Sequence, residues 1–234
     1  MLLPTQIRNR VLDMSVGGRR IRELLYPAYV RLYPLLFRPR HFLYEGKRYR
    51  YMFHPYGATL KSERIVEIPI AFEEMNAHAG KRILEVGNVL NHYRSGTHVV
   101  LDKYERNDGC LNIDVMDYQP ASRFDFIVSI STVEHIGWNE HERESEKAVR
   151  ALQRMHAMLE PGGTMLVTIP WRYHPALDRY MQSSECLFER VCYMKRISRR
   201  NVWRQYDVGA LEGVQYGSPY PFANALLVCY AHGR

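Results

Sequence analysis

The feature that most restricts the fold of this chain is a series of short apolar segments between residues 82 and 230. The strand candidates read RILEVG, HVVLDKY, FDFIVSIS, TMLVTIP and ANALLVCY. Several are nearly continuous apolar runs, which are typical of strands buried on both faces of a parallel sheet. The pattern predicts an α/β fold, Rossmann-like and doubly wound, with a mostly parallel sheet of about seven strands.

Helical patterns surround these strands. The stretch EKAVRALQRMHAML has apolar residues at helical spacing and predicts an amphipathic crossover helix that stops at residues 160–163, Glu-Pro-Gly-Gly. A second helix is predicted from SERIVEIPIAFEEMNAH, with Ser62 as its cap and a kink or break at Pro69. Residues 186–205 are interpreted as an amphipathic helix with a solvated basic face, and nucleic-acid binding is the alternative.

Positive charge is concentrated near the N-terminus. Residues 1–50 hold eleven Lys or Arg and three acids, a net charge of +8, whereas the whole chain carries +7. This distribution argues against a uniformly basic nucleic-acid-binding surface. It favours a basic, Tyr-rich, helical extension or lid over residues 1–60, followed by the main domain over residues 61–234. Pro27 and Pro34 are expected to break residues 5–40 into short pieces. This region is either a cap that packs on the main domain or a contact with a membrane surface or a partner.

The chain is expected to be cytoplasmic. Whether residues 1–40 also make peripheral contact with a membrane stays open. No apolar run approaches the roughly 20 residues of a membrane span, and Arg8 and Arg10 interrupt any signal-peptide core. The four cysteines lack both CxxC spacing and the density of a disulfide scaffold. A homo-oligomer stays an open expectation.

Acidic residues follow the ends of the predicted strands. Glu85 and then Gly87 end the first, Asp102 ends the second seventeen residues after Glu85, and Asp114 and Asp117 precede the third. In a doubly wound sheet, ligands bind at the carboxyl ends of the strands, where an acid can accept hydrogen bonds from a ribose. The alternative for Asp102 and Asp114 is a solvated carboxylate or a helix cap.

These segments together resemble the class I S-adenosylmethionine-dependent methyltransferases. The corresponding motifs read LEVGNVLNHY, VVLDKYE, IDVMDY, FDFIVSISTVEHI and LEPGGTMLVTIP, in the family's order, over residues 80–170. Of the three glycines common in the first motif only Gly87 is present, with Val89 and Asn91 at the other two places, and the segment up to Asp102 is about one helical turn shorter than is typical. Within the superfamily, the chain is similar to a bacterial family known mainly as a domain of unknown function.

The resemblance implies a set of cofactor-binding residues. Glu85 and Gly87 would lie beside the methionine part of S-adenosylmethionine, Asp102 would bind the ribose, and Asp114 and Val115 would lie beside the adenine. The full set of candidates for binding S-adenosylmethionine is Glu85, Gly87, Asn88, Asp102, Lys103, Asp114, Val115 and Ser131.

Glu134 and His135, directly after the FDFIVSIS strand, are the first candidates for catalysis. A histidine there can act as a base or orient the acceptor, because its pKa suits proton transfer near neutrality. His135 could instead be structural, or with Glu134 it could bind a divalent ion such as Mg²⁺. The ligand pattern Glu-x-x-Glu-His of some methyltransferases has Ser131 at its first position here.

The loop PWRYHPALD supplies further candidates. His174 is a catalytic candidate, and Trp171, Arg172 and Tyr173 suit a sugar, since rings stack on its faces and polar groups bond its hydroxyls. The alternative is a surface loop in which Trp171 covers the core. His92 and Tyr93, after the first turn, are also candidates for substrate binding.

The sequence thus predicts an S-adenosylmethionine-dependent O-methyltransferase that acts on a hydroxyl of a carbohydrate, glycan or similar polar small molecule. Two alternatives stay open. One is a non-catalytic partner module with the same fold, motivated by the glycine-poor first motif. The other is an RNA or protein methyltransferase that docks through its basic N-terminus.

Overall fold

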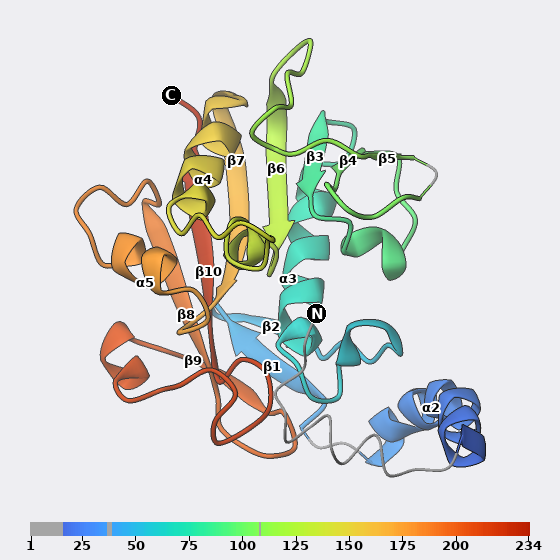
Figure 1. Cartoon of the computed structure of the whole chain (residues 1–234). Helices are drawn as coiled ribbons and strands as arrows, with labels where there is room; N and C mark the ends of the chain where they lie inside the picture. Colours follow the sequence, from blue (N-terminus) through green and yellow to red (C-terminus); the bar gives the residue numbers. More distant parts are fainter. Residues whose placement is uncertain (1–15, 37–38, 108) are drawn as a thin grey trace.

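An eight-stranded sheet forms the centre of the computed structural model, which describes residues 16–36, 39–107 and 109–234 (Figure 1). The strand order is β5-β4-β3-β6-β7-β10-β8-β9. The strands are β3 (Ile83–Val86), β4 (Val99–Leu101), β5 (Cys110–Leu111), β6 (Phe124–Ile130), β7 (Leu159–Pro170), β8 (Arg190–Arg196), β9 (Trp203–Tyr206) and β10 (Ala225–His232). The five strands from β5 to β7 are parallel, β10 runs antiparallel between β7 and β8, and β9 is antiparallel to β8. The predicted Rossmann-like, mostly parallel α/β fold is confirmed.

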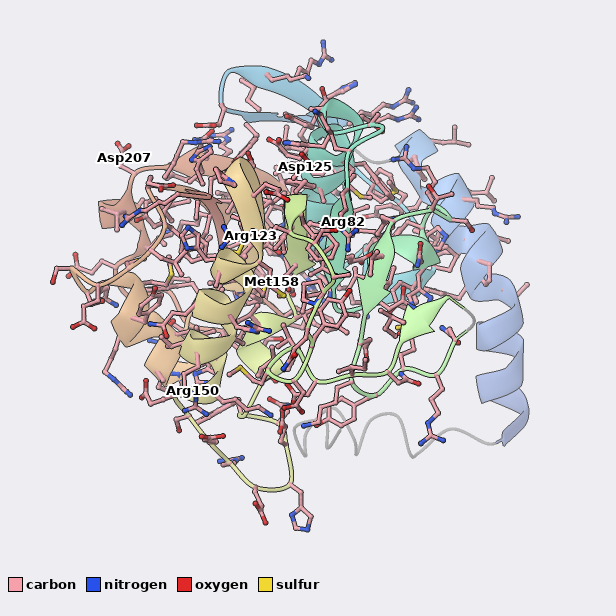
Figure 2. The ribbon with its side chains drawn as sticks, turned by 90° about the horizontal axis from the view of Figure 1, so that it is seen from above. Arg82, Arg123, Asp125, Arg150, Met158 and Asp207 are labelled. Carbon is pink, nitrogen blue, oxygen red and sulfur yellow. The ribbon has the colours of Figure 1, made fainter. Side chains whose placement is uncertain are left out.

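Both faces of the sheet are covered, as the continuous apolar strands predicted. Successive side chains of a strand point to opposite faces, so Ile127 belongs to one apolar cluster while Phe126 and Val128 belong to the other. The first cluster includes the buried face of α4 (Lys147–Ala157), and the second includes that of α3 (Arg64–Ala77). Seen from the end where the central strands begin, α3 and α4 lie on opposite sides of the sheet (Figure 2).

The end of the sheet shown in Figure 2 is the one away from the candidate ligand site. Arg82 and Arg123 directly precede β3 and β6, and both are labelled there. The backbone N–H of Arg82 donates to the Asp125 carboxylate at 2.8 Å, which joins the two strand starts. The strands therefore run away from the viewer in Figure 2, and downward in Figure 1, toward their carboxyl ends.

The predicted crossover helix and the helix after Ser62 are both present, as α4 and α3. Pro69 lies inside α3 without ending it. A proline cannot donate to the carbonyl four residues before it, which here is that of Ile65. The backbone N–H of Met52 donates to this carbonyl at 3.0 Å instead. The helix continues to Ala77. The bond from Met52 attaches the segment before α3 to the helix.

The Tyr-rich segment forms a two-stranded hairpin of β1 (His41–Tyr44) and β2 (Lys47–Arg50). Phe42 and Tyr44 are buried in the α3-side cluster, and the Tyr44 hydroxyl donates to the Tyr230 hydroxyl at 3.0 Å. After the hairpin, the Tyr51 hydroxyl accepts from the N–H of Trp203 at 2.9 Å and donates to its carbonyl at 3.3 Å. The hairpin segment is thereby joined to β9, the edge strand of the sheet.

The amphipathic helix predicted over residues 186–205 is wrong. The segment contains β8 and most of β9, antiparallel to each other, with β8 paired to β10. Buried Cys192, Met194 and Arg196 alternate with half-buried residues, which is the period of a strand. Basic and apolar residues of this segment also alternate at roughly helical spacing, so the local pattern alone is compatible with an amphipathic helix. Pairing with β10, whose residues lie thirty to forty positions further along the chain than their partners in β8, favours the strand over the helix.

The breaks predicted at Pro27 and Pro34 are also wrong for the described residues. One helix, α2 (Val16–Leu36), runs through both prolines. Because they are seven residues apart, they lie on one side of the helix, and the hydrogen bonds on its other side are retained. Residues 1–15 and 37–38, on which part of that prediction falls, lie outside the described residues. Within the described part of the chain, no helix has the length and apolar character needed to cross a membrane.

The other helical elements are short. They are α5 (Pro175–Met181) and the 3-10 turns η1 (Tyr56–Ala58), η2 (Leu90–His92), η3 (Val133–His135) and η4 (Val208–Leu211).

Candidate functional site

The turn after β3 is shaped by Gly87 and Glu85. Gly87 has a φ of 88°, where only glycine is free of strain, and a Cβ at this position would overlap the Thr132 side chain. The Glu85 carboxylate is fully buried and accepts from the N–H groups of Val89 and Leu90 at 2.8 and 2.6 Å. A single 3-10 turn, η2, follows.

The other oxygen of Glu85 lies 2.7 Å from Nε2 of His98, directly before β4. One carboxylate therefore holds both ends of the segment between β3 and β4. Glu85 does not line the cavity described below. Its contacts are with the protein's own backbone and His98.

Asp102 organises the turn after β4. One carboxylate oxygen accepts from the N–H groups of Tyr104 and Glu105, both at 2.8 Å, and the other accepts from the N–H of Asn88 at 3.2 Å. A carboxylate offers about four lone-pair sites, so this one retains capacity for one further donor. Parallel strands β3 and β4 end side by side, which is why the acid of the second strand meets the turn of the first.

Asp114 lies in a network of four charges. Its carboxylate accepts from Lys147 at 2.7 Å and from Lys103 at 3.0 Å, and both lysines also contact Glu140. Burial by itself would raise the pKa of Asp114. Hydrogen bonds from Lys147, the N–H of Met116 and Lys103 outweigh it and hold that pKa at about 2. The network therefore joins the β5–β6 segment, the turn after β4 and the start of α4.

These turns surround a cavity of about 450 Å³ at the carboxyl ends of β3, β4 and β6. Seven of the eight predicted cofactor-binding residues line it, and Glu85 is the exception. The seven are Gly87, Asn88, Asp102, Lys103, Asp114, Val115 and Ser131, and His135 lines the cavity as well. The volume is within the range of small-molecule sites, about 300–1,000 Å³.

The cavity also has lining residues that the sequence did not indicate. They include Tyr56, Arg64, Tyr104, Glu105, Thr132 and Glu140. Tyr104, Glu105 and Thr132 lie inside the quoted motifs, next to predicted residues, so proximity along the chain could have suggested them. Tyr56 and Arg64 come from before the first sheet strand, and no local pattern marks them.

Arg64 extends from the first turn of α3 to the end of β6. Its guanidinium donates to the carbonyls of Ile130 and Ser131 at 2.8 and 3.3 Å and pairs with Glu67 at 2.9 Å. The Glu67 carboxylate also accepts from the hydroxyls of Ser131 and Thr168 at 2.7 and 2.8 Å. This buried group fixes the backbone directly before η3, on which the catalytic candidates lie.

Glu134 and His135 are adjacent but differ in environment. Glu134 is buried, which raises its pKa well above that of an exposed carboxyl, and one of its oxygens has no hydrogen-bond partner. The His135 side chain is 43% exposed and faces the cavity, and burial of its ring lowers its pKa. Its Nε2 lies 3.7 Å from the nearer Glu134 oxygen. At neutral pH the imidazole of His135 is therefore uncharged and able to accept a proton.

Of the loop after β7, Tyr173 comes nearest to His135. The two rings pack edge to face with centroids 5.0 Å apart, and the Tyr173 hydroxyl and the Asn139 side-chain amide hydrogen bond at 3.0 Å. Trp171 is buried in the core beneath the exposed Arg172 guanidinium, which lies 4.8 Å from its ring. None of Trp171, Arg172 and Tyr173 lines the cavity.

His174 is a helix cap. Its side chain is buried and accepts from the N–H of Leu177 at the start of α5, at 3.4 Å, and its ring packs on Trp138. His92 and Tyr93 are behind the cavity wall, where the His92 ring stacks on Tyr56 at 3.9 Å and the Tyr93 hydroxyl donates to the Tyr56 carbonyl at 3.2 Å. They position a lining residue.

A metal would need several ligands around one point. Among the described residues, no three His, Cys, Asp or Glu side chains come together in that way. Ser131, at the first ligand position of the Glu-x-x-Glu-His pattern, donates its hydroxyl to Glu67. The residues therefore do not fit the Mg²⁺ site that this pattern would form.

Comparison with known proteins gives matches in structure only. No protein-family model and no curated protein matches the chain. A solved N-methyltransferase, NodS from Bradyrhizobium japonicum in complex with S-adenosyl-L-homocysteine, is 12% identical over 73% of this chain and 91% of its own, with a TM-score of 0.41. An amino pentose methyltransferase from Micromonospora echinaspora, with S-adenosylmethionine bound, is 13% identical over 70% of this chain and 89% of its own, with a TM-score of 0.36.

A methyltransferase from Thermotoga maritima, described as a possible histamine N-methyltransferase, is 13% identical over 66% of this chain and 82% of its own, with a TM-score of 0.41. These are likenesses of fold. Independently of these likenesses, the segments that resemble class I methyltransferase motifs place residues at the strand ends of a Rossmann-like sheet, around one cavity.

Proposed function

We propose that the protein is an S-adenosylmethionine-dependent methyltransferase. The observation that carries the proposal is the convergence of Gly87, Asp102, Asp114 and Ser131, from four separate turns, on one cavity. Carboxylates that only cap helices or face solvent would have no reason to share a cavity. A cavity at the carboxyl ends of the central parallel strands is also where doubly wound folds bind nucleotide-like ligands.

The lining residues fit an adenosyl ligand. The oxygen of Asp102 that accepts only from the N–H of Asn88 can accept from a ribose hydroxyl as well. The side-chain oxygen of Asn88 is buried on the cavity wall without a hydrogen-bond partner, and a ligand donor would satisfy it. Gly87 leaves room between the turn and Thr132 that any side chain would fill.

The acceptor would bind between the cavity and Tyr173. When bound, S-adenosylmethionine supplies a methyl group activated for displacement by its positive sulfur. The chain's part is to orient the acceptor in line with that group and to take its proton. His135 is suited to the second task, because it faces the cavity and its uncharged imidazole can act as a base.

We infer O-methylation of a carbohydrate or a similar polar small molecule. Support comes from the mixture of aromatic and hydrogen-bonding groups next to His135, namely the Tyr173 ring and the Asn139 amide. Ring faces pack on sugars, and amides and hydroxyls bond their oxygens. His135, which faces the cavity beside this group, is the side chain that would take the proton of the acceptor hydroxyl.

Two measurements test the proposal. Calorimetry of the full chain with S-adenosylmethionine and S-adenosylhomocysteine should give binding at micromolar concentrations. A labelled-methyl assay over fractionated host extract, with and without Mg²⁺ or a chelator, should give transfer that the chelator leaves unchanged. No binding of either ligand would contradict the proposal and favour the non-catalytic module. Transfer to RNA or protein fractions alone would contradict the small-molecule acceptor.

A further inference from the structure

Helix α2 carries an unusual share of the exposed apolar surface. Twelve large apolar side chains are exposed among the described residues, and five of them lie between residues 25 and 35. Leu25, Leu32 and Leu35 are 61–64% exposed and Tyr29 is 53% exposed. Single exposed leucines need no explanation, but a contiguous group marks an interaction surface.

The four most exposed of these residues share one side of α2. Positions 25, 29 and 32 follow the i, i+4, i+7 spacing of a single helix face, and position 35 adjoins it. The other side faces the domain, where Val30 is fully buried and the Tyr33 ring packs on Phe53 with centroids 5.9 Å apart. Figure 1 shows α2 at the margin of the molecule, away from the sheet. The helix therefore attaches by one side and presents an apolar face outward.

The sequence of α2 is strongly basic. It contains Arg19, Arg20, Arg22 and Arg31 and a single acid, Glu23. Among the residues with described side chains, the exposed Arg31 lies next to the apolar face, on the side of Leu35. Packing this face against a second copy of the same basic helix would bring like charges together, which is unfavourable. An anionic surface with an apolar interior complements both the apolar face and the positive charge of the helix.

We propose that α2 lies in the plane of an anionic lipid bilayer surface and attaches the protein to it. Leucines on the outward face would enter the boundary between headgroups and acyl chains, as in other interfacial amphipathic helices. Tyr29 suits the headgroup level, where tyrosine is enriched. The arginines would contact lipid phosphates, each adding to the attraction toward a negative leaflet. This proposal does not depend on the proposed methyl transfer.

Vesicle co-sedimentation of the full chain tests it. The protein should bind vesicles of phosphatidylcholine and phosphatidylglycerol in equal parts, bind vesicles of phosphatidylcholine alone far more weakly, and lose affinity as salt rises. The double variant Leu25→Asn/Leu32→Asn should bind at least about tenfold more weakly. The matched control is Val208→Asn, because Val208 is equally exposed at 61% but lies on η4.

A second pair of variants tests the contribution of the positive charge of Arg31. Arg31→Gln should weaken binding to the mixed vesicles, whereas Arg204→Gln, an exposed arginine on β9, should not. All substituted side chains are exposed, so unchanged melting temperatures are expected and would show that folding is intact. Absence of vesicle binding by the wild type would overturn the proposal. So would equal losses in the control variants, or light scattering that shows a dimer abolished by Leu25→Asn/Leu32→Asn.

Discussion

The carboxylate of Asp102 accepts a hydrogen bond from the backbone N–H of Asn88 at 3.2 Å, across the two neighbouring strand ends β4 and β3. The acid that the sequence marked for ribose binding therefore also joins the two turns that form the cavity wall. Its removal affects the cofactor site in two ways, through the lost acceptor and through the released turn.

Asp102→Ala should weaken binding of S-adenosylmethionine about 10- to 100-fold, which corresponds to about 1–3 kcal/mol for a charge-assisted hydrogen bond. Calorimetry measures the change. Asp117→Ala is the matched control, since Asp117 is an exposed acid three residues from Asp114 that does not line the cavity. Equal affinity of the Asp102 variant and the wild type for S-adenosylmethionine would show that Asp102 does not bind the cofactor.

His135→Ala should keep its affinity for S-adenosylmethionine and lose turnover by about 10²- to 10⁴-fold, the usual contribution of a general base. The control is His141→Ala, an exposed histidine beyond the cavity. Burial lowers the pKa of His135 from 6.5, so in the wild type kcat/KM should fall on the acid side of neutrality, with its inflection below pH 6.5. Full activity of the alanine variant would exclude His135 as the base.

Asp114 should make stability depend on pH in the acid range. Its pKa of about 2 lies below the ordinary value of 3.8, so its stabilising effect is complete above pH 4 and lost as pH falls toward 2. Urea unfolding of wild type and Asp114→Asn should differ by about 2 kcal/mol at pH 6. The difference should shrink between pH 4 and pH 2, and a gap that does not change with pH would contradict the ion-pair network.

Glu85→Ala should destabilise the protein by about 1–3 kcal/mol, because it leaves the buried N–H of Leu90 without an acceptor and leaves the N–H of Val89 with the Gly87 carbonyl alone. Glu85→Gln keeps one oxygen for these donors and should cost less than the alanine variant. Urea unfolding at pH 7 compares the two. Similar stability of Glu85→Ala and wild type would show that the turn does not depend on this carboxylate.

The sequence predicted those parts of the fold that local patterns specify. Continuous apolar runs identified β3, β4, β6, β7 and β10, and helical spacing identified α3 and α4. Seven of the eight cofactor candidates, which the family resemblance implied, line one cavity, because parallel strands end at the same edge of a sheet.

Other parts depend on contacts between distant residues. Arg64 reaches the carbonyl of Ile130, sixty-six residues away, and no pattern near either residue indicates it. Segment 186–205 became two strands because β10 offered a partner. Glu85 was assigned to the cofactor by family resemblance, yet its carboxylate binds the turn backbone. With His98 it maintains a turn that has one glycine where class I methyltransferases commonly have three.

The hydroxyl of Tyr51, bonded to both backbone groups of Trp203, has a consequence for behaviour in concentrated solution. Open sheet edges expose donors and acceptors to which another molecule can add a strand, the first step of aggregation. At β9 the hydroxyl of Tyr51 already bonds the N–H and the carbonyl of Trp203. Strand addition there would require the hairpin segment to detach first, so the fold protects its longer open edge without an additional strand.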